Sequence, residues 1–72
     1  MSELEIRESN LLVIAAVEGY AYKYNMSTID VIRLFMAHDI FKKIRSQYKV
    51  LHMLDLDDVV DFAEDMLKRV TA

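Results

Sequence analysis

The sequence has no cysteine, no proline, no tryptophan and a single glycine, Gly19. Without cysteine the chain can form neither a disulfide nor a thiolate metal site. Proline and glycine are the usual residues of tight turns, so their near absence excludes collagen-like, linker-like and turn-rich all-β chains. The composition favours a helical chain.

A strong charge of one sign and a long apolar run are also lacking. Twelve acidic and nine basic residues give a net charge of −3, whereas nucleic-acid-binding proteins usually carry an excess of basic residues. The longest apolar run covers residues 11–17, and a membrane-spanning helix needs about 20 residues. The first ten residues lack the basic and apolar regions of a signal peptide. We therefore expect a cytoplasmic protein with no membrane segment, for which nucleic acid is a disfavoured partner.

Apolar residues are present in excess, at 54% of the 72 residues, where about 45–50% is usual. This length predicts a single domain, residues 1–72, and so small a domain buries only about 60% of its unfolded surface. Part of the apolar surplus is then left for another surface to cover. We expect a protein partner or a homo-oligomer, with a dimer as the expected form.

The spacing of apolar residues predicts a compact all-α domain of four helices. The predicted helices cover about residues 3–24, 28–37, 39–46 and 56–70, and the last of them is the most clearly amphipathic. Ser27, followed by Asp30, is the predicted N-cap of the second helix, and Asp39 is the predicted N-cap of the third. Residues 47–54 have no regular periodicity, which predicts an extended connector.

The first predicted helix has an unusually wide apolar face, which suggests an interface. On a helical projection Leu12 and Ala16 fall on the side expected to face water. Tyr20, Tyr22 and Tyr24 cannot all point toward one core, and tyrosine is enriched at protein interfaces. We expect these five residues to form the partner interface, although core packing is an alternative explanation for the tyrosines.

Three polar residues are candidates for an internal polar anchor: Glu18, Tyr48 and His52. Burying a lone carboxylate is costly, so we expect Glu18 either to lie at the edge of the apolar face or to pair with a basic residue of segment 42–49, with Tyr48 or with His52. The His52 ring is expected to bond a backbone carbonyl or a carboxylate. A partner contact, or metal or acid–base chemistry together with His38, is the alternative for His52. The two histidines are not spaced as metal ligands usually are, so they give little indication of a metal site. No serine lies in a sequence motif typical of a catalytic nucleophile. We predict no catalytic residues, no metal and no cofactor.

Four basic residues form the only sizeable basic cluster: Lys42, Lys43, Arg45 and Lys49. Segment 55–65 has six acidic residues, so charge is separated along the chain. The cluster could be a solvated surface, or it could bind an acidic partner or a phosphate. A small nucleic-acid-binding regulator that uses this cluster is our alternative to a protein-interaction module.

The segment 48–53 (YKVLHM), followed by the helix with 59–62 (VVDF), resembles a motif of a known family. That family comprises small bacterial and phage proteins of about this length, classed as a domain of unknown function, and the resemblance covers about residues 10–70. The matching positions are Glu18, Tyr20, Ala21, Met26, Ser27, Val31, Leu34, Phe35, Tyr48, Val50, Leu51 and His52. This chain departs from the family pattern at Met53, where threonine is usual, and in segment 54–57.

Genes of the resembled family often lie beside genes for ADP-ribosyltransferase-like proteins. The resemblance therefore implies an antitoxin-like or accessory member of a two-protein bacterial or phage system. We expect a non-enzymatic protein-interaction module.

Overall fold

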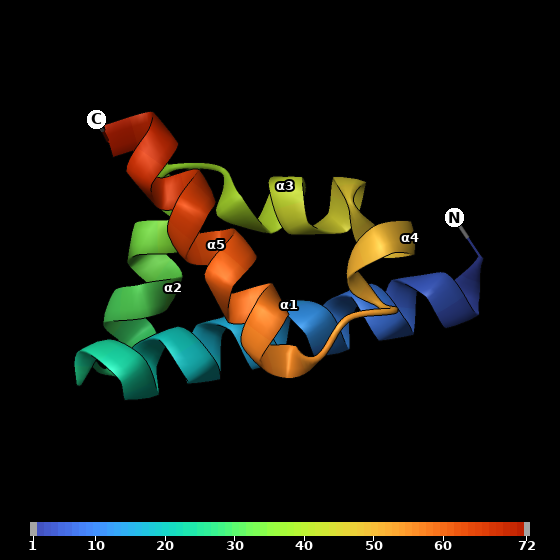
Figure 1. Cartoon of the computed structure of the whole chain (residues 1–72), viewed down its shortest axis with the longest axis horizontal. Coiled ribbons are helices and arrows are strands. Elements are labelled where there is room, and N and C mark those ends of the chain that lie inside the picture. Colours follow the sequence, from blue (N-terminus) through green and yellow to red (C-terminus); the bar gives the residue numbers. More distant parts are fainter. Residues whose placement is uncertain (1, 72) are drawn as a thin grey trace.

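The computed structural model describes residues 2–71, which form five helices (Figure 1). They are α1 (Glu3–Tyr24), α2 (Thr28–Ala37), α3 (Ile40–Ser46), α4 (Tyr48–Leu51) and α5 (Leu56–Thr71). No strand occurs within residues 2–71, and the predicted all-α class is confirmed. The four predicted helices correspond to α1, α2, α3 and α5, and each begins and ends within one residue of its predicted bounds.

Short polar side chains define the helix ends. The Ser2 hydroxyl accepts a hydrogen bond from the Glu5 N–H at the start of α1. Ser27 accepts one from the Asp30 N–H, at 3.1 Å, so its predicted N-cap role is confirmed. Asp39 occupies the predicted N-cap position of α3, where its carbonyl accepts a hydrogen bond from the Lys43 N–H at 3.2 Å, but it has a left-handed conformation and its side chain makes no cap bond.

The predicted extended connector over residues 47–54 is wrong in its first half, where α4 forms one helical turn. The Leu51 N–H donates to the Gln47 carbonyl, and the His52 N–H donates to the Tyr48 carbonyl, both at 2.9 Å. One turn places Tyr48 and Leu51 on the same side, where both are buried. The burial of this pair, which local periodicity does not reveal, stabilises the turn.

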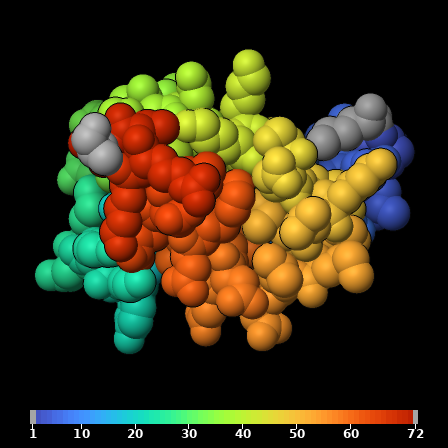
Figure 2. Space-filling view, turned by 45° about the horizontal axis from the view of Figure 1, so that its top comes forward, coloured from blue at the N-terminus to red at the C-terminus, as the bar shows by residue number. Residues whose placement is uncertain are grey.

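The helices α2 to α5 all pack against one side of α1, which forms the base of the molecule (Figure 1). In the view of Figure 2, α3, α4 and α5 cover the middle of α1, which reaches the surface mainly at its two ends. Within residues 2–71, no helix lies over the opposite side of α1.

A single core lies between α1 and the helices that cover it, and Phe35 of α2 is fully buried there. The Phe35 ring makes edge contacts with Tyr20, at 5.3 Å between ring centroids, and with Phe41, at 5.8 Å. On α5, Val59, Ala63 and Leu67 form a buried apolar stripe, as expected of the helix predicted to be the most clearly amphipathic. Val70, at the end of that stripe, is exposed.

Candidate functional site

The side of α1 that no other helix covers has apolar side chains in water. We call it the outward face of α1, and it comprises Leu4, Arg7, Leu11, Ile14, Glu18 and Tyr22. Spacings of three and four residues place these side chains on one side of the helix. Leu4 is 63% exposed, Leu11 64% and Ile14 57%. A surface helix normally has polar residues on its exposed side, so these three aliphatic side chains are unusual there.

The expectation that Leu12 and Ala16 lie on an exposed side is wrong. Leu12 is only 7% exposed and Ala16 is fully buried. They share one row of α1 with Gly19 and Lys23, and that row lies against α5. A helical projection has no information on where α5 packs. It therefore predicted that this row is exposed to solvent.

The three tyrosines of the expected interface have different surroundings. Tyr20 is half-buried against the core, and its ring lies 4.5 Å from that of Tyr24. Tyr24 is partly exposed, and Tyr22 is 91% exposed at the end of the outward face. Only Tyr22 therefore lies on the same surface as Leu11 and Ile14.

A shallow apolar hollow of about 180 Å³ borders the outward face, between α1, α2 and α3. It is lined by Val13, Ile14, Val17, Glu18, Thr28, Ile32 and Phe41. A cavity of about 150 Å³ can hold a benzene molecule, so the hollow has room for one large apolar side chain. It extends the apolar surface from α1 onto α2 and α3.

Glu18 is exposed at the edge of this hollow, as one of the two alternatives predicted, and its hydrogen-bond partner is not among those expected for the other alternative. Its Oε1 accepts a hydrogen bond from the Thr28 hydroxyl at 3.1 Å, and it makes no ion pair within residues 2–71. Thr28 begins α2, which starts directly beside the C-terminal end of α1. Tyr48 contacts a residue ten positions earlier in α1, so it is out of reach of Glu18.

Tyr48 and His52 do meet, in a polar cluster whose carboxylate is Glu8. The Tyr48 hydroxyl donates a hydrogen bond to Glu8, and the His52 ring stacks on the Tyr48 ring with 4.8 Å between centroids. His52 Nδ1 donates to the Tyr48 carbonyl at 2.9 Å, a backbone contact of the kind predicted for this ring. Sequence reasoning missed Glu8, because no local pattern relates two residues 40 positions apart. The cluster fixes α4 to the N-terminal half of α1.

We expect Glu8→Gln to lower the pKa of Tyr48. The hydrogen bond to the Glu8 carboxylate, together with burial, raises the pKa of Tyr48 to about 12 from its ordinary 10.0. Loss of the carboxylate should move the last tyrosine titration toward its ordinary range, which tyrosinate absorbance measures. Glu3→Gln is the control, because Glu3 pairs with Arg7 instead. A tyrosine titration unchanged by Glu8→Gln would contradict the contact.

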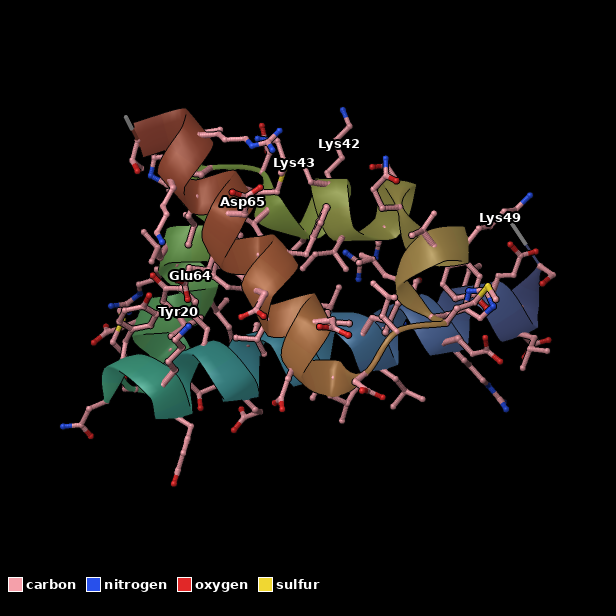
Figure 3. The ribbon with its side chains drawn as sticks, in the orientation of Figure 1. Tyr20, Lys42, Lys43, Lys49, Glu64 and Asp65 are labelled. Carbon is pink, nitrogen blue, oxygen red and sulfur yellow. The ribbon has the colours of Figure 1, made fainter. Side chains whose placement is uncertain are left out.

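A second polar cluster joins α1 to α5 around Glu64, which lies beside Tyr20 in Figure 3. Lys23 Nζ lies 2.6 Å from Glu64 Oε2, and Lys68 Nζ lies 3.2 Å from Oε1. The hydrogen bond from Lys23, with further ones from Tyr24 and Lys68, lowers the pKa of Glu64 to about 2. The same interaction raises the pKa of Lys23. The cluster is a cross-link between α1 and α5.

Acidification should reveal the contribution of Glu64 to stability. Its pKa is about 2 in the folded chain against an ordinary 4.5, so this contribution is complete above about pH 4.5 and is lost as the pH falls toward 2. We expect Glu64→Gln to be less stable than the wild type at neutral pH and equally stable near pH 2, by urea unfolding. Asp65→Asn, which removes an exposed pair with Arg69, is the control. A difference that persists unchanged near pH 2 would contradict this prediction.

The basic cluster is dispersed over α3 and α4. Arg45 Nη2 donates to Asn10 Oδ1 at 2.8 Å, which ties it to α1. Figure 3 shows Lys42 pointing away from the fold above α3, with Lys49 at the far end of the molecule. Within residues 2–71, Lys42, Lys43 and Lys49 form no ion pair.

The described part of the chain shows two further absences. Residues 2–71 contain no group of three or more His, Asp or Glu side chains that could hold a metal ion. Among these residues no helix combines the length and the apolar character needed to cross a membrane.

One comparison with known proteins assigns the chain to a family. The sequence model of a family described as proteins of unknown function (DUF3791) matches residues 12–69, which is more than half of the chain. The chain belongs to this family. No curated protein and no solved structure matches the chain.

The region shared with DUF3791 includes most of the fold but only part of the outward face. It contains α2 to α4, most of α5 and the C-terminal half of α1. Ile14, Glu18 and Tyr22 lie inside the match, whereas Leu4, Arg7 and Leu11 precede it. The family match therefore covers the hollow completely, and the outward face continues beyond it.

Proposed function

We propose that this domain is a non-enzymatic protein-interaction module that binds its partner through the outward face of α1. The observation that carries this proposal is the exposure of Leu4, Leu11 and Ile14 on a helix whose other side is fully packed. Monomeric proteins rarely expose large contiguous apolar patches, and such patches commonly mark protein interaction sites. The adjoining hollow would give one partner side chain a defined place.

The family resemblance supports a more specific form of this proposal. We propose that the domain is the antitoxin-like or accessory member of a two-protein bacterial or phage system. Its partner would then be the product of the neighbouring gene.

The experiment is a capture of that neighbouring product by the tagged chain on co-expression. We expect the double variant Leu11→Gln/Ile14→Gln to lose at least about tenfold in affinity, because each buried aliphatic side chain contributes about 1.5–3 kcal/mol and 1.4 kcal/mol corresponds to tenfold. Glutamine is a good helix former and both sites are exposed, so the fold should persist.

The matched control is Met36→Gln/Met53→Gln, which removes two exposed apolar side chains elsewhere on the surface. Capture that is absent for the wild type, or equal for both double variants, would contradict the proposed interface.

A nucleic-acid-binding regulator is the second candidate, favoured by the lack of ion pairs at Lys42, Lys43 and Lys49 within residues 2–71. Phosphate contacts give a steep dependence of affinity on salt. Filter binding of duplex DNA and RNA at two salt concentrations tests it, and no retention at low salt would exclude it.

A further inference from the structure

The outward face of α1 is self-complementary in its charges and in the placement of its apolar residues when two copies run antiparallel. Its four central residues, Arg7, Leu11, Ile14 and Glu18, follow one another at spacings of four, three and four. This symmetric spacing places a cation at one end, an anion at the other and two aliphatic residues between them. Reversing the direction of the helix therefore brings each residue opposite a suitable one.

We propose that the partner of this face is a second copy of the chain, paired about a twofold axis that passes α1 between Leu11 and Ile14. In this register Leu11 of one copy packs on Ile14 of the other, and Arg7 faces Glu18. Each contact occurs twice, as in any interface with twofold symmetry. The proposal rests on the function proposed above: it assigns that same surface to a second copy of the chain, which the neighbouring gene product would displace when it binds.

The charged groups at both ends of the face are available for this pairing. Arg7 is 76% exposed, and its only ion pair within residues 2–71 is with Glu3, at 3.8 Å. Such an exposed pair contributes little, so Arg7 can exchange it for a contact with a second copy. Glu18 is exposed, and the hydrogen bond from Thr28 engages only its Oε1.

The extent of the face also suits a helix-on-helix contact. The 22 residues of α1 span about 33 Å, and the longest dimension of the molecule is 32 Å. A second copy can thus lie along α1, because α2 to α5 pack mainly on the other side of that helix (Figure 1), and it would meet α2 and α3 only at the apolar hollow. The apolar hollow beside Ile14 lies at the edge of this contact and would receive side chains of the second helix.

A charge exchange tests the register. In sedimentation equilibrium we expect the wild type to form a dimer, and Arg7→Glu and Glu18→Arg each to weaken it about tenfold, because each change places like charges together twice. The double variant Arg7→Glu/Glu18→Arg should restore the wild-type affinity. The control Arg69→Glu breaks an equivalent exposed pair, with Asp65, away from the face and should leave the dimer unchanged.

Cysteine cross-linking gives an independent reading, since the chain has no cysteine of its own. A mixture of Arg7→Cys and Glu18→Cys chains should form a disulfide-linked heterodimer on oxidation. Neither variant alone should cross-link, because equivalent residues of the two copies would lie about 16 Å apart along the helix axis. A disulfide spans only about 4.4–6.8 Å between Cα atoms.

Three results would overturn the self-pairing. The first is a wild type that stays monomeric at millimolar concentration. The second is a dimer affinity of Arg7→Glu/Glu18→Arg that stays below that of the wild type. The third is a disulfide-linked homodimer of Arg7→Cys or Glu18→Cys alone. A monomer that still captures the neighbouring gene product, and loses it in Leu11→Gln/Ile14→Gln, would refute self-pairing while the proposed function stands.

Discussion

Phe35→Ala is expected to destabilise the protein by about 3–5 kcal/mol, the usual cost of removing a fully buried aromatic ring. Phe35 is completely buried and contacts both Tyr20 and Phe41 edge-on, so it joins α1, α2 and α3. A protein of 72 residues typically has about 4–11 kcal/mol of stability in total. We therefore expect a variant that unfolds at far lower urea concentration, or that is partly unfolded without urea.

The measurement is urea unfolding followed by circular dichroism at one fixed protein concentration, because any dimer adds a concentration-dependent contribution. Met53→Ala is the control, since Met53 is 79% exposed and lies away from the outward face, so its loss should change stability by no more than about 0.5 kcal/mol. A loss below about 1 kcal/mol for Phe35→Ala would contradict the packing of the three rings.

Gly19→Ala should destabilise the protein, although alanine is the better helix former. A Cβ at position 19 would lie 2.3 Å from Cγ2 of Val60, well inside the contact distance. Val60 has a single preferred rotamer in a helix, so relief requires α5 to move away from α1. Overpacking of this kind costs about 1–3 kcal/mol, against a gain of about 1 kcal/mol in helix propensity. We expect a net loss.

A double-mutant cycle isolates this contact. In a Val60→Ala background the obstructing methyl group is absent, so Gly19→Ala should become neutral or stabilising by about 1 kcal/mol. Thermal and urea unfolding of the four proteins provide the comparison. Equal effects of Gly19→Ala in both backgrounds would show that the helices do not meet at this residue.

The polar contacts show which interactions can be predicted from local sequence patterns and which cannot. The Ser27 cap and the contact of His52 with a nearby backbone carbonyl are local, and both follow from residues within a few positions of each other. The partners of Glu8 and Lys23 lie 40 and 41 residues away. Such pairs form only because the tertiary arrangement brings α4 and α5 against α1.

The interface residues show the same limit. Sequence alone predicted an associating surface on the first helix, but it chose Leu12 and Ala16, which are buried. The 22-residue helix has apolar residues around most of its circumference, so several of its sides could pack on the core. Its own periodicity does not determine which side does so. The choice depends on where α5 crosses.

Composition and spacing by themselves determined the helical class, the bounds of α1, α2, α3 and α5, and the existence of an apolar surplus, because these follow from local propensity and periodicity. Tertiary structure decided where the surplus lies. Val60 of α5 approaches α1 at Gly19, on the same row as Leu12 and Ala16, which are buried, whereas Leu11 and Ile14 remain exposed. The near absence of proline and glycine ensured long helices, and the one glycine present lets two of them pack closely enough to define which face of α1 remains uncovered.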